Sequence, residues 1–479
     1  MCRLPRLARS FHAPASPTTQ PTTQPTTRPA VVMVAMVTMF TMFTMVTAML
    51  AARPAAGQGF GGGGFGNQAV GGITINASGL VNDLDPQATA EVARQRQEAL
   101  AGVDAAANGR RKVSLARLTR GVAEAAERGE PLPVEMLVLG GLTRVELVLV
   151  DPEHADIVLV GPAEAPIVGP TGCIVGADSG WPLLQLEDFV VALRSIEGAR
   201  AAGMTCSIDP TPEGIAKLQR TLRGRRIVGG NPEPTLRAME EALGPQRVSV
   251  TGVPGGSRFA RVLVAADYRM KRIGMGFDPS GVDGLPSYLS MIPASGGGLM
   301  PRFWLEARYD PIQRDADELA WRISGRRMEC LTENELADAA GDRQRQGRAD
   351  PLARQWCEKM TEHYEKLCEE QPVFAELLNC VDLAVVAALV RGRQLDRRAG
   401  LDLSPLLDAD AVPLPTYEVP SSVATLASAV RKGRTWVVTA SGGVAFQPWA
   451  FAANLAKADD LAGQRTAGLA TRRDGWWWD

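Results

Sequence analysis

Short apolar runs, broken by turn residues, dominate the first half of the chain. Apolar residues at helical spacing predict a helix over 186–196, and polar, Ala- and Arg-rich helices are predicted over 91–129. Strands are predicted at 134–139, 144–150 and 156–160. The last two strands are expected to form a hairpin that places His154 at its turn.

Farther along the chain, helix-start signals alternate with further apolar runs. Thr211-Pro212 and Asn231-Pro232 each place a polar residue and a proline ahead of apolar residues at helical spacing, which is typical of a helix N-terminus. Further strands are predicted at 226–228, 247–253, 259–266, 303–308 and 328–331. This alternation of strands and helices favours a mixed α/β core.

The last third of the chain predicts two hairpins. Residues 351–391 predict a helical hairpin joined at Gln371-Pro372, whose second helix is apolar on nearly every side and is therefore expected to be buried. A final β-hairpin is predicted through Ser441-Gly442-Gly443. The sequence thus predicts the α+β class (mixed α/β), with a β-rich first half that contains short helices.

Shifts in composition predict the domain organisation. The segment at 58–72, which follows the N-terminal segment, is rich in glycine and has too few apolar residues to form a core. This composition predicts a linker. The predicted parts are an export signal at 1–57, the Gly-rich linker at 58–72, an α+β domain at 73–225, a second α/β domain at 226–330, the helical hairpin and short β-hairpin at 331–450, and a mobile tail at 451–479.

The N-terminal segment has the three-part pattern of an export signal. Arginines precede an apolar run at 30–52, and the small residues Ala55-Ala56-Gly57 follow it. Cleavage after Gly57 is predicted, because the run is rich in Met and Thr and ends in small residues. The alternative is a membrane anchor through 30–52, since the run is long enough to span a bilayer. Membrane contact is expected only in that case.

Composition and charge narrow the classes of partner. The chain is 45% hydrophobic, which is typical of a globular protein and excludes fibrous and fully disordered classes. Residues 1–57 contain five arginines and no acidic residue, so their removal changes the net charge from −2 to −7. Nucleic acids and anionic membranes attract basic proteins, so neither is an expected partner of the mature chain.

The cysteines fit an oxidising compartment. Of the seven, Cys2 lies in the predicted export signal, and the even number that remains is typical of disulfide pairing. Cys173 with Cys206 is the predicted pair. Cys357 and Cys368 are expected on one helix at a separation of about 16 Å, which is too far for a disulfide. No Cys/His spacing of a metal site occurs, so no metal or other cofactor is predicted.

The sequence offers few residues for the familiar catalytic motifs. It contains three histidines. His154 is interpreted as a solvated turn residue and His363 as a structural residue, because no second histidine lies four residues from His363. Ser441 has glycine neighbours, but neither histidine has a sequence context that fits a serine nucleophile.

Asp267 is the best candidate for a ligand-site residue. It follows the strand predicted at 259–266, with Arg269 and Lys271 close behind, and strand ends in α/β domains often bind ligands. Tyr288 is expected to line the same pocket. The more ordinary interpretation is a solvated strand end with surface ion pairs.

Several blocks of the sequence are similar to one bacterial family. The blocks are 156–164, 182–194, 206–219, 257–272 and 379–390. They resemble an exported family of planctomycete bacteria that carries the domain of unknown function numbered 1598. The resemblance covers roughly residues 110–450. It implies export and a shared folded core, and it assigns no catalytic residue because the family has no known activity.

Two functions are compatible with these observations. The first is an exported, non-catalytic protein with a structural or binding role in the cell envelope, located in the periplasm or outside the cell. The alternative is a carboxylate-dependent hydrolase of envelope or extracellular polymers, with Asp267 in or near its site.

Overall fold

The computed structural model describes most of the chain beyond the N-terminal segment. The described residues are 69–70, 73–75, 81–83, 86–100, 109–223, 232–294, 301–337, 343–346, 350–432, 434–471 and 475–479. They belong to one compact unit, Ala55–Asp479. The predicted export signal at 1–57, with its apolar run at 30–52, and the strand predicted at 226–228 lie outside the described residues. So does the predicted linker at 58–72, apart from Ala69 and Val70.

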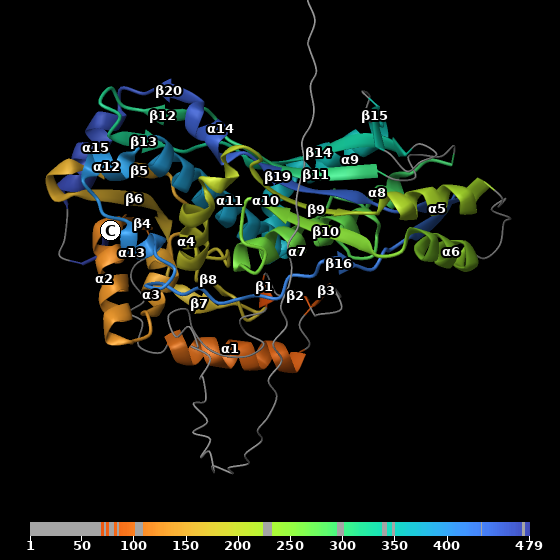
Figure 1. Cartoon of the computed structure of the whole chain (residues 1–479), viewed down its shortest axis with the longest axis horizontal. Helices are drawn as coiled ribbons and strands as arrows, with labels where there is room; N and C mark the ends of the chain where they lie inside the picture. Colours follow the sequence, from red (N-terminus) through yellow and green to blue (C-terminus); the bar gives the residue numbers. More distant parts are fainter. Residues whose placement is uncertain are drawn as a thin grey trace, which may run out of the picture. The chain divides into compact units, whose positions relative to one another are not determined.

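Two seven-stranded sheets form the framework (Figure 1). In spatial order, the strands of the first sheet are β15 (Arg343–Gln346), β14 (Arg327–Ala337), β11 (Pro301–Arg308), β19 (Ser441–Phe446), β9 (Met204–Asp209), β10 (Gln246–Thr251) and β16 (Ser422–Val423). Those of the second sheet are β20 (Leu455–Lys457), β12 (Ile312–Arg314), β13 (Ala320–Arg322), β5 (Leu147–Asp151), β6 (Asp156–Ala163), β4 (Gly109–Ser114) and β21 (Trp477–Trp478). Neighbouring strands in both sheets are antiparallel except for β11–β19 and β12–β20.

Smaller sheets complete the strand pairing of the described residues. They are β1 (Ala69–Val70) with β2 (Ile73–Ile75) and β3 (Val81–Asp83), β7 (Pro166–Val168) with β8 (Ile174–Gly176), and β17 (Ser428–Lys432) with β18 (Arg434–Val438). The first large sheet takes β9, β11 and β19 from the three different segments that the sequence predicted as domains. The predicted boundaries at 225 and 330 therefore fall inside the span of one continuous sheet.

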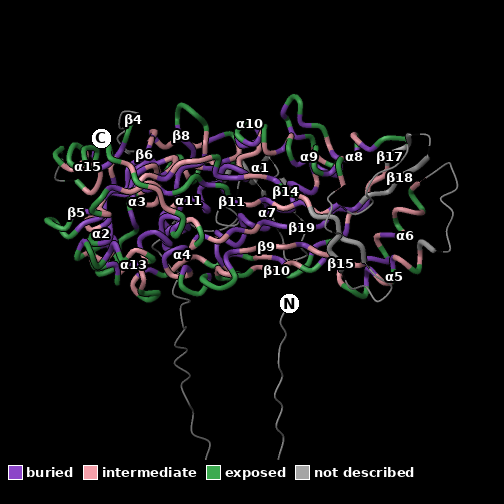
Figure 2. Tube along the Cα trace, turned by 90° about the horizontal axis from the view of Figure 1, so that it is seen from above, coloured by how far each residue is buried: buried purple, intermediate pink, exposed green. Residues whose placement is uncertain are grey.

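Helices pack around and between the two large sheets. They are α1 (Pro86–Leu100), α2 (Leu115–Arg128), α3 (Val134–Leu137), α4 (Leu186–Ser195), α5 (Pro212–Arg223), α6 (Glu233–Leu243), α7 (Arg258–Gly274), α8 (Tyr288–Met291), α9 (Pro351–Glu362), α10 (Tyr364–Glu370), α11 (Pro372–Gly392), α12 (Leu395–Ala399), α13 (Ser404–Leu407), α14 (Pro448–Ala453) and α15 (Leu461–Ala470). Figures 1 and 2 both show α4 and α11 between the two sheets. The predicted mixed α+β class is confirmed.

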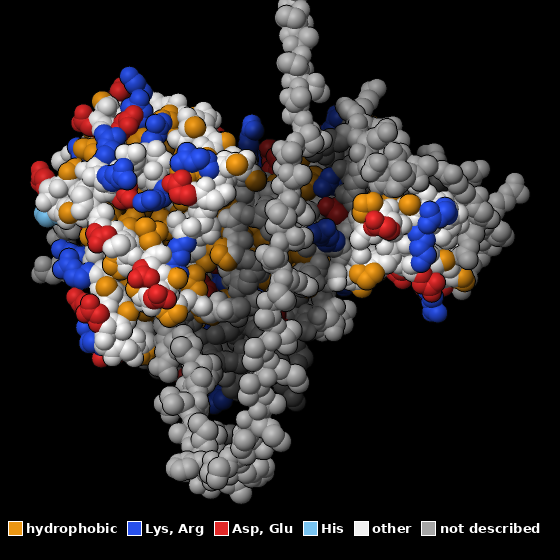
Figure 3. All heavy atoms as spheres, viewed as in Figure 1, with side chains coloured by type: hydrophobic (Ala, Val, Ile, Leu, Met, Phe, Trp, Pro, Cys, Tyr) orange, Lys and Arg blue, Asp and Glu red, His pale blue; other side chains and the backbone are white. Residues whose placement is uncertain are grey.

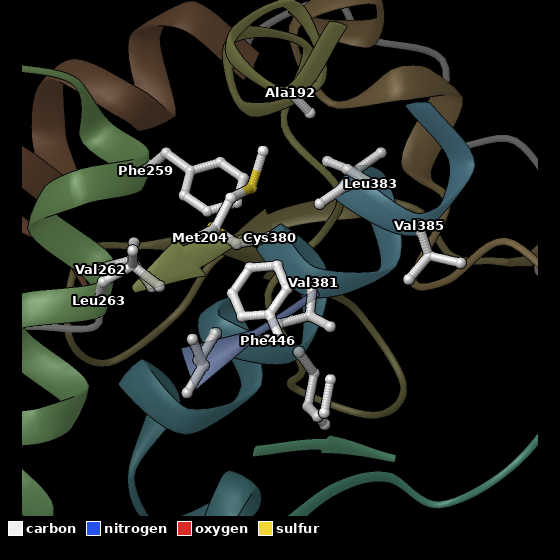
Figure 4. Close-up of a cluster of buried hydrophobic side chains, with 14 of the residues drawn as sticks. Ala192, Met204, Phe259, Val262, Leu263, Cys380, Val381, Leu383, Val385 and Phe446 are labelled. Carbon is white, nitrogen blue, oxygen red and sulfur yellow. The ribbon is translucent and has the colours of Figure 1, made fainter. Parts of the chain in front are cut away.

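The core is built where α4, α7 and α11 meet strands of the first sheet. Met204 of β9 and Phe446 of β19 are register partners in the sheet. Figure 4 shows these two side chains beside Phe259 of α7 and Val381 of α11. All four are buried. The helices are thus held mainly by apolar packing against one sheet face.

Among the described residues, α11 is the one helix long and apolar enough to cross a membrane. Every residue from Val373 to Val390 is buried within the protein, as the tube in Figure 2 also shows. The predicted burial of this helix is therefore confirmed, and its composition is that of a core helix.

The strand predicted at 259–266 is wrong, because this segment is the first half of α7. The Ser257 hydroxyl caps the helix by accepting a hydrogen bond from the Ala260 N–H at 3.1 Å. A fully buried helix and a buried strand give the same continuous apolar run, so spacing alone does not separate them. The run at 134–139 is likewise not a strand: it contains α3, which begins after Pro133.

The prediction of a final β-hairpin through Ser441-Gly442-Gly443 is also wrong. The strands on either side exist as β18 and β19, but they do not pair with each other. β18 pairs with β17, whereas β19 lies between β11 and β9 in the first sheet. The glycines expected at a turn are inside β19. A Cβ on Gly442 would lie 1.8 Å from the Phe303 carbonyl oxygen, so glycine is required there by the close approach of a neighbouring strand.

The predicted mobile tail at 451–479 instead contains β20, α15 and β21. β21 pairs with β4, and the Trp478 side chain is buried against β5 and β6 residues such as Leu149 and Val158. The Arg111 Nε also donates a hydrogen bond to Asp479 Oδ1 at 2.9 Å. An apolar aromatic residue near the end of the chain thus anchors this segment to the second sheet.

The predicted helical hairpin at 351–391 is present, with one difference. Its first helix is interrupted at His363, whose backbone ends α9 and precedes α10. Cys357 and Cys368 therefore lie on different helices rather than on one continuous helix.

Candidate functional site

Asp267 lies in the middle of α7 and is fully buried. Its Oδ2 accepts a hydrogen bond from Lys271 Nζ at 2.9 Å, one helical turn farther on. The same Nζ donates to the carbonyl oxygens of Ile208, at 2.8 Å, and Gly442, at 3.2 Å. Lys271 therefore joins α7 to β9 and β19, which is a structural contact within the core.

Burial raises the pKa of Asp267 to about 7, and the neighbouring Lys271 ammonium opposes this rise. A carboxyl group with this pKa resembles a general acid. However, the exposed fraction of Asp267 is 0%, so a polymeric substrate has no access to it. The predicted solvated strand end is likewise not observed, because the group lies inside a helix that packs on the sheet.

The other two predicted site residues make separate contacts. Arg269 Nη1 donates to Asp278 Oδ2 at 2.8 Å, and the Tyr288 ring packs edge-on against Phe303 at a centroid distance of 5.6 Å. Residues two apart share a face of a strand, whereas on a helix they point in nearly opposite directions. The structure thus brings Asp267 and Lys271 together and separates Arg269 from them, because the segment is helical.

The histidines make local contacts. His154 Nδ1 lies 2.8 Å from Asp151 Oδ2 in the turn between β5 and β6, which confirms its predicted place in that turn. His363 lies at the break between α9 and α10. The described residues contain no group of three or more His, Cys, Asp or Glu side chains arranged to hold a metal ion.

The cysteines from Cys173 onward are free thiols, and all are buried. Cys173 lies in the turn before β8, and Cys206 lies in β9 of a different sheet. The predicted Cys173–Cys206 disulfide is therefore absent from this structure. An even number of cysteines does not identify which of them pair, because pairing depends on which elements pack together.

A buried cluster of charged residues surrounds Arg258, the first residue of α7. Its guanidinium group forms ion pairs with Asp188, with Glu187 at 3.5 Å and with Glu376 at 2.9 Å. The Tyr417 hydroxyl donates to Glu187 Oε1 at 2.9 Å. One arginine therefore links the N-terminal ends of α4, α7 and α11.

This cluster contains more buried negative charge than one arginine neutralises. Burial raises the pKa of Glu187 to about 7, against the opposing effect of Arg258. Burial also raises the pKa of Asp188 to about 6, and Glu376 adds to this rise. Both carboxyl groups therefore bind protons in the folded protein at pH values where they are ionised in the unfolded chain.

We expect the unfolding free energy to decrease as the pH rises from 5 to 8. A carboxyl group whose folded pKa is raised stabilises the protein below its unfolded pKa, and this contribution is lost as the pH passes the folded value. Glu187, Asp188 and Asp267 act in the same direction, with a combined effect on the order of 6 kcal/mol. Urea unfolding at pH 5 and pH 8 measures the difference.

The Glu187→Gln variant provides the comparison for this prediction. It removes one of the titrating groups while keeping the side-chain length, so its unfolding free energy should change less between the two pH values. A wild-type protein that is equally stable or more stable at pH 8 would contradict the assignment of these raised pKa values.

A pocket of about 650 Å³ lies between α2 and the segment that contains α13. Val122, Ala125, Leu132 and Val412 contribute buried apolar side chains to it. The acidic residues in its lining are Glu127, Glu130, Asp408 and Asp410. Figure 3 shows acidic and hydrophobic side chains side by side on the face over α2 and α13.

The wall formed by residues 404–413 is held in place by Arg194 at the end of α4. Its guanidinium group donates to the carbonyl oxygens of Leu406 at 2.9 Å, Asp408 at 2.7 Å and Val412 at 2.9 Å. These hydrogen bonds fix the backbone of α13 and of the irregular residues that follow it. The pocket therefore has a preformed wall, as is common for ligand sites.

The pocket lining combines apolar and acidic side chains. Its lining, which belongs wholly to the described part of the chain, includes four acidic residues and no lysine or arginine. Arg128 nearby pairs with Glu130 at 2.7 Å, and the Arg194 guanidinium interacts with the Asp408 carboxylate, which leaves Glu127 and Asp410 as the main source of negative potential. Sequence patterns did not indicate this site, because its two walls are almost 300 residues apart in the chain.

Fold and pocket together define a mixed α/β protein with an apolar, acid-rimmed pocket. The chain contains a domain described as a protein of unknown function, DUF1598, over residues 206–288. The resembling blocks at 206–219 and 257–272 lie within this match. No curated protein and no solved structure is significantly similar to this chain.

The matched residues run from β9 through α5, α6, β10 and α7 to the start of α8. They include the Asp267–Lys271 pair and Arg258, which attach α7 to the rest of the core. The pocket residues lie on both sides of this span in the sequence. The domain therefore supplies part of the framework rather than the pocket itself.

Proposed function

We propose that this protein is an exported, non-catalytic binding protein of the cell envelope that takes ligands with an apolar body and a cationic group. The observation that carries the proposal is the pocket between α2 and α13, with its apolar floor and acidic rim. Burial of the ligand's apolar part supplies most of the affinity, and the carboxylates select the charge.

Export is part of the same proposal. It is supported by the basic flank, apolar run and small-residue exit of residues 1–57 and by the resemblance to an exported planctomycete family. A cleaved signal would release the protein to the periplasm or the exterior, and an uncleaved one would anchor it through 30–52. N-terminal sequencing of the protein from the cell-envelope fraction distinguishes the two.

A carboxylate-dependent hydrolase centred on Asp267 is less compatible with the geometry. Such an enzyme needs its carboxyl groups beside the scissile bond of the substrate. Asp267 is instead buried and ion-paired with Lys271, and it does not line the pocket.

We expect the protein to bind dodecyltrimethylammonium, below its micelle concentration, more tightly than dodecyl sulfate. The two probes share one apolar chain and differ in the sign of the head group, so calorimetric titration with each isolates the effect of charge. The double variant Glu127→Gln/Asp410→Asn should weaken binding of the cationic probe about fivefold, since each exposed charge contributes less than about 1 kcal/mol.

A bulky substitution tests whether the pocket itself is the site. Ala126 lines the pocket and is exposed, so Ala126→Trp should occupy the space and abolish binding without affecting the core. For the double charge variant, Glu197→Gln is the matched control, because Glu197 is an exposed acidic residue outside the pocket lining. Equal affinity for both head groups, or unchanged binding by Ala126→Trp, would overturn the proposal.

A further inference from the structure

Two buried cysteines from different elements, Cys330 and Cys357, lie where α9 packs on β14. The backbone N–H of Cys330 in β14 donates to the Thr361 hydroxyl of α9 at 2.8 Å. Cys357 precedes Thr361 by one helical turn and so faces the same strand. The neighbouring Cys357 thiol also contributes, after burial, to the raised pKa of the Cys330 thiol.

We propose that Cys330 and Cys357 form a disulfide when the protein folds in an oxidising compartment. The inference rests on the export that the proposed function includes, and it is independent of the pocket. The bond would tie the base of the β14–β15 hairpin to α9. It would close the stretch of chain between the two cysteines, which constrains the unfolded state.

The oxidant is a disulfide outside the chain, either a small-molecule disulfide or that of a thiol–disulfide oxidase. The thiolate of one cysteine attacks it, forms a mixed disulfide and releases one thiol. The thiolate of the second cysteine then attacks the first cysteine's sulfur and releases the second thiol. Two protein thiols lose two electrons, the outside disulfide gains them, and the two protons pass to the released thiolates.

This reaction belongs to folding rather than to the folded protein. Both side chains are almost completely buried once β14 and α9 are packed. Burial also raises the pKa of the Cys330 thiol, so little thiolate is present to react. The remaining described cysteines lie on other elements, and Cys368 of α10 is the nearest competitor along the chain.

The full chain, unfolded with a reductant, is refolded in a mixture of oxidised and reduced glutathione. The remaining thiols are then alkylated, and the linked peptides are mapped by mass spectrometry. The expected product is a Cys330–Cys357 link, with Cys2, Cys173, Cys206, Cys368 and Cys380 alkylated. Folded, reduced protein should react with the same mixture at least about tenfold more slowly, because its thiols are buried. Thiols that all stay free after refolding, or a dominant link to another cysteine, would overturn the proposal.

Single cysteine variants test whether this disulfide raises the melting temperature. The oxidised wild-type protein should melt about 2–6 °C above the reduced protein. Cys330→Ser and Cys357→Ser should each remove this difference, whereas the control Cys173→Ser should retain it. If the link forms in vitro but is absent from protein isolated from its cells, the pairing is supported and the proposed export is contradicted.

Discussion

Replacement of Arg258 by methionine is expected to lower the unfolding free energy by about 3–5 kcal/mol at pH 8. Methionine keeps much of the side-chain volume and removes the charge. Glu187, Asp188 and Glu376 would then remain buried without the cation that pairs with all three. Uncompensated buried charge is among the most destabilising changes in proteins. Urea unfolding, monitored by tryptophan fluorescence, measures the loss.

The pH dependence of the same variant separates charge from packing. At pH 5, Glu187 and Asp188 should be largely protonated, since burial raises their pKa values to about 7 and about 6. The loss caused by Arg258→Met should therefore be smaller at pH 5 than at pH 8. A loss of equal size at both pH values would indicate that the guanidinium acts through packing alone.

Arg237→Met is the matched control for this experiment. Arg237 lies on α6, its side chain is 76% exposed, and its partner Glu233 is 3.7 Å away. Exposed ion pairs of this kind contribute at most about 1 kcal/mol. The control should therefore change the unfolding free energy by less than about 0.5 kcal/mol.

The substitution Gly442→Ala is expected to cost at least about 4 kcal/mol or to prevent folding altogether. The added methyl group would lie 1.8 Å from the Phe303 carbonyl oxygen and 2.7 Å from its carbonyl carbon. These are backbone atoms of the adjacent strand β11, so no side-chain movement relieves the overlap. Gly442 also has a φ of +126°, a backbone conformation that L-residues other than glycine rarely adopt. Circular dichroism and thermal unfolding measure the effect.

Gly463→Ala is the matched control. Gly463 lies within α15 and is exposed, and a Cβ built there meets no atom within 4 Å. Alanine has the higher helix propensity, so this variant should be stabilised by about 0.5–1 kcal/mol. Similar effects of the two substitutions would mean that β19 is not clamped between β11 and β9 as the structure shows.

Local signals in the sequence predict the structure correctly where an element depends only on residues close to one another in the chain. The helix at 186–196, the hairpin with His154 at its turn and the helix after Thr211 are all present. Thr211 supplies the expected cap, since its hydroxyl accepts a hydrogen bond from the Gly214 N–H at 3.0 Å. Each of these features depends on residues within a few positions of one another.

The candidate site shows the limit of such signals. The sequence predicts that Asp267 follows the end of a strand, yet the apolar run before it is part of α7 and the carboxyl group is buried in the core. The pocket joins α2 to α13, and the carboxyl cluster around Arg258 draws on three helices and Tyr417. No spacing within one segment encodes contacts between residues so far apart.

The sequence by itself determined the mixed α+β class and several helix starts, such as those at Leu186, Pro212 and Pro351, because short-range spacing and composition carry those features. Tertiary structure alone decided that 259–266 is helical, that β19 is an interior strand and that the chain end pairs with β4. It also decided which charges are buried. Neighbouring strands and helices bury these residues and supply their hydrogen-bond and ion-pair partners. The residues that meet in this way are far apart in the sequence.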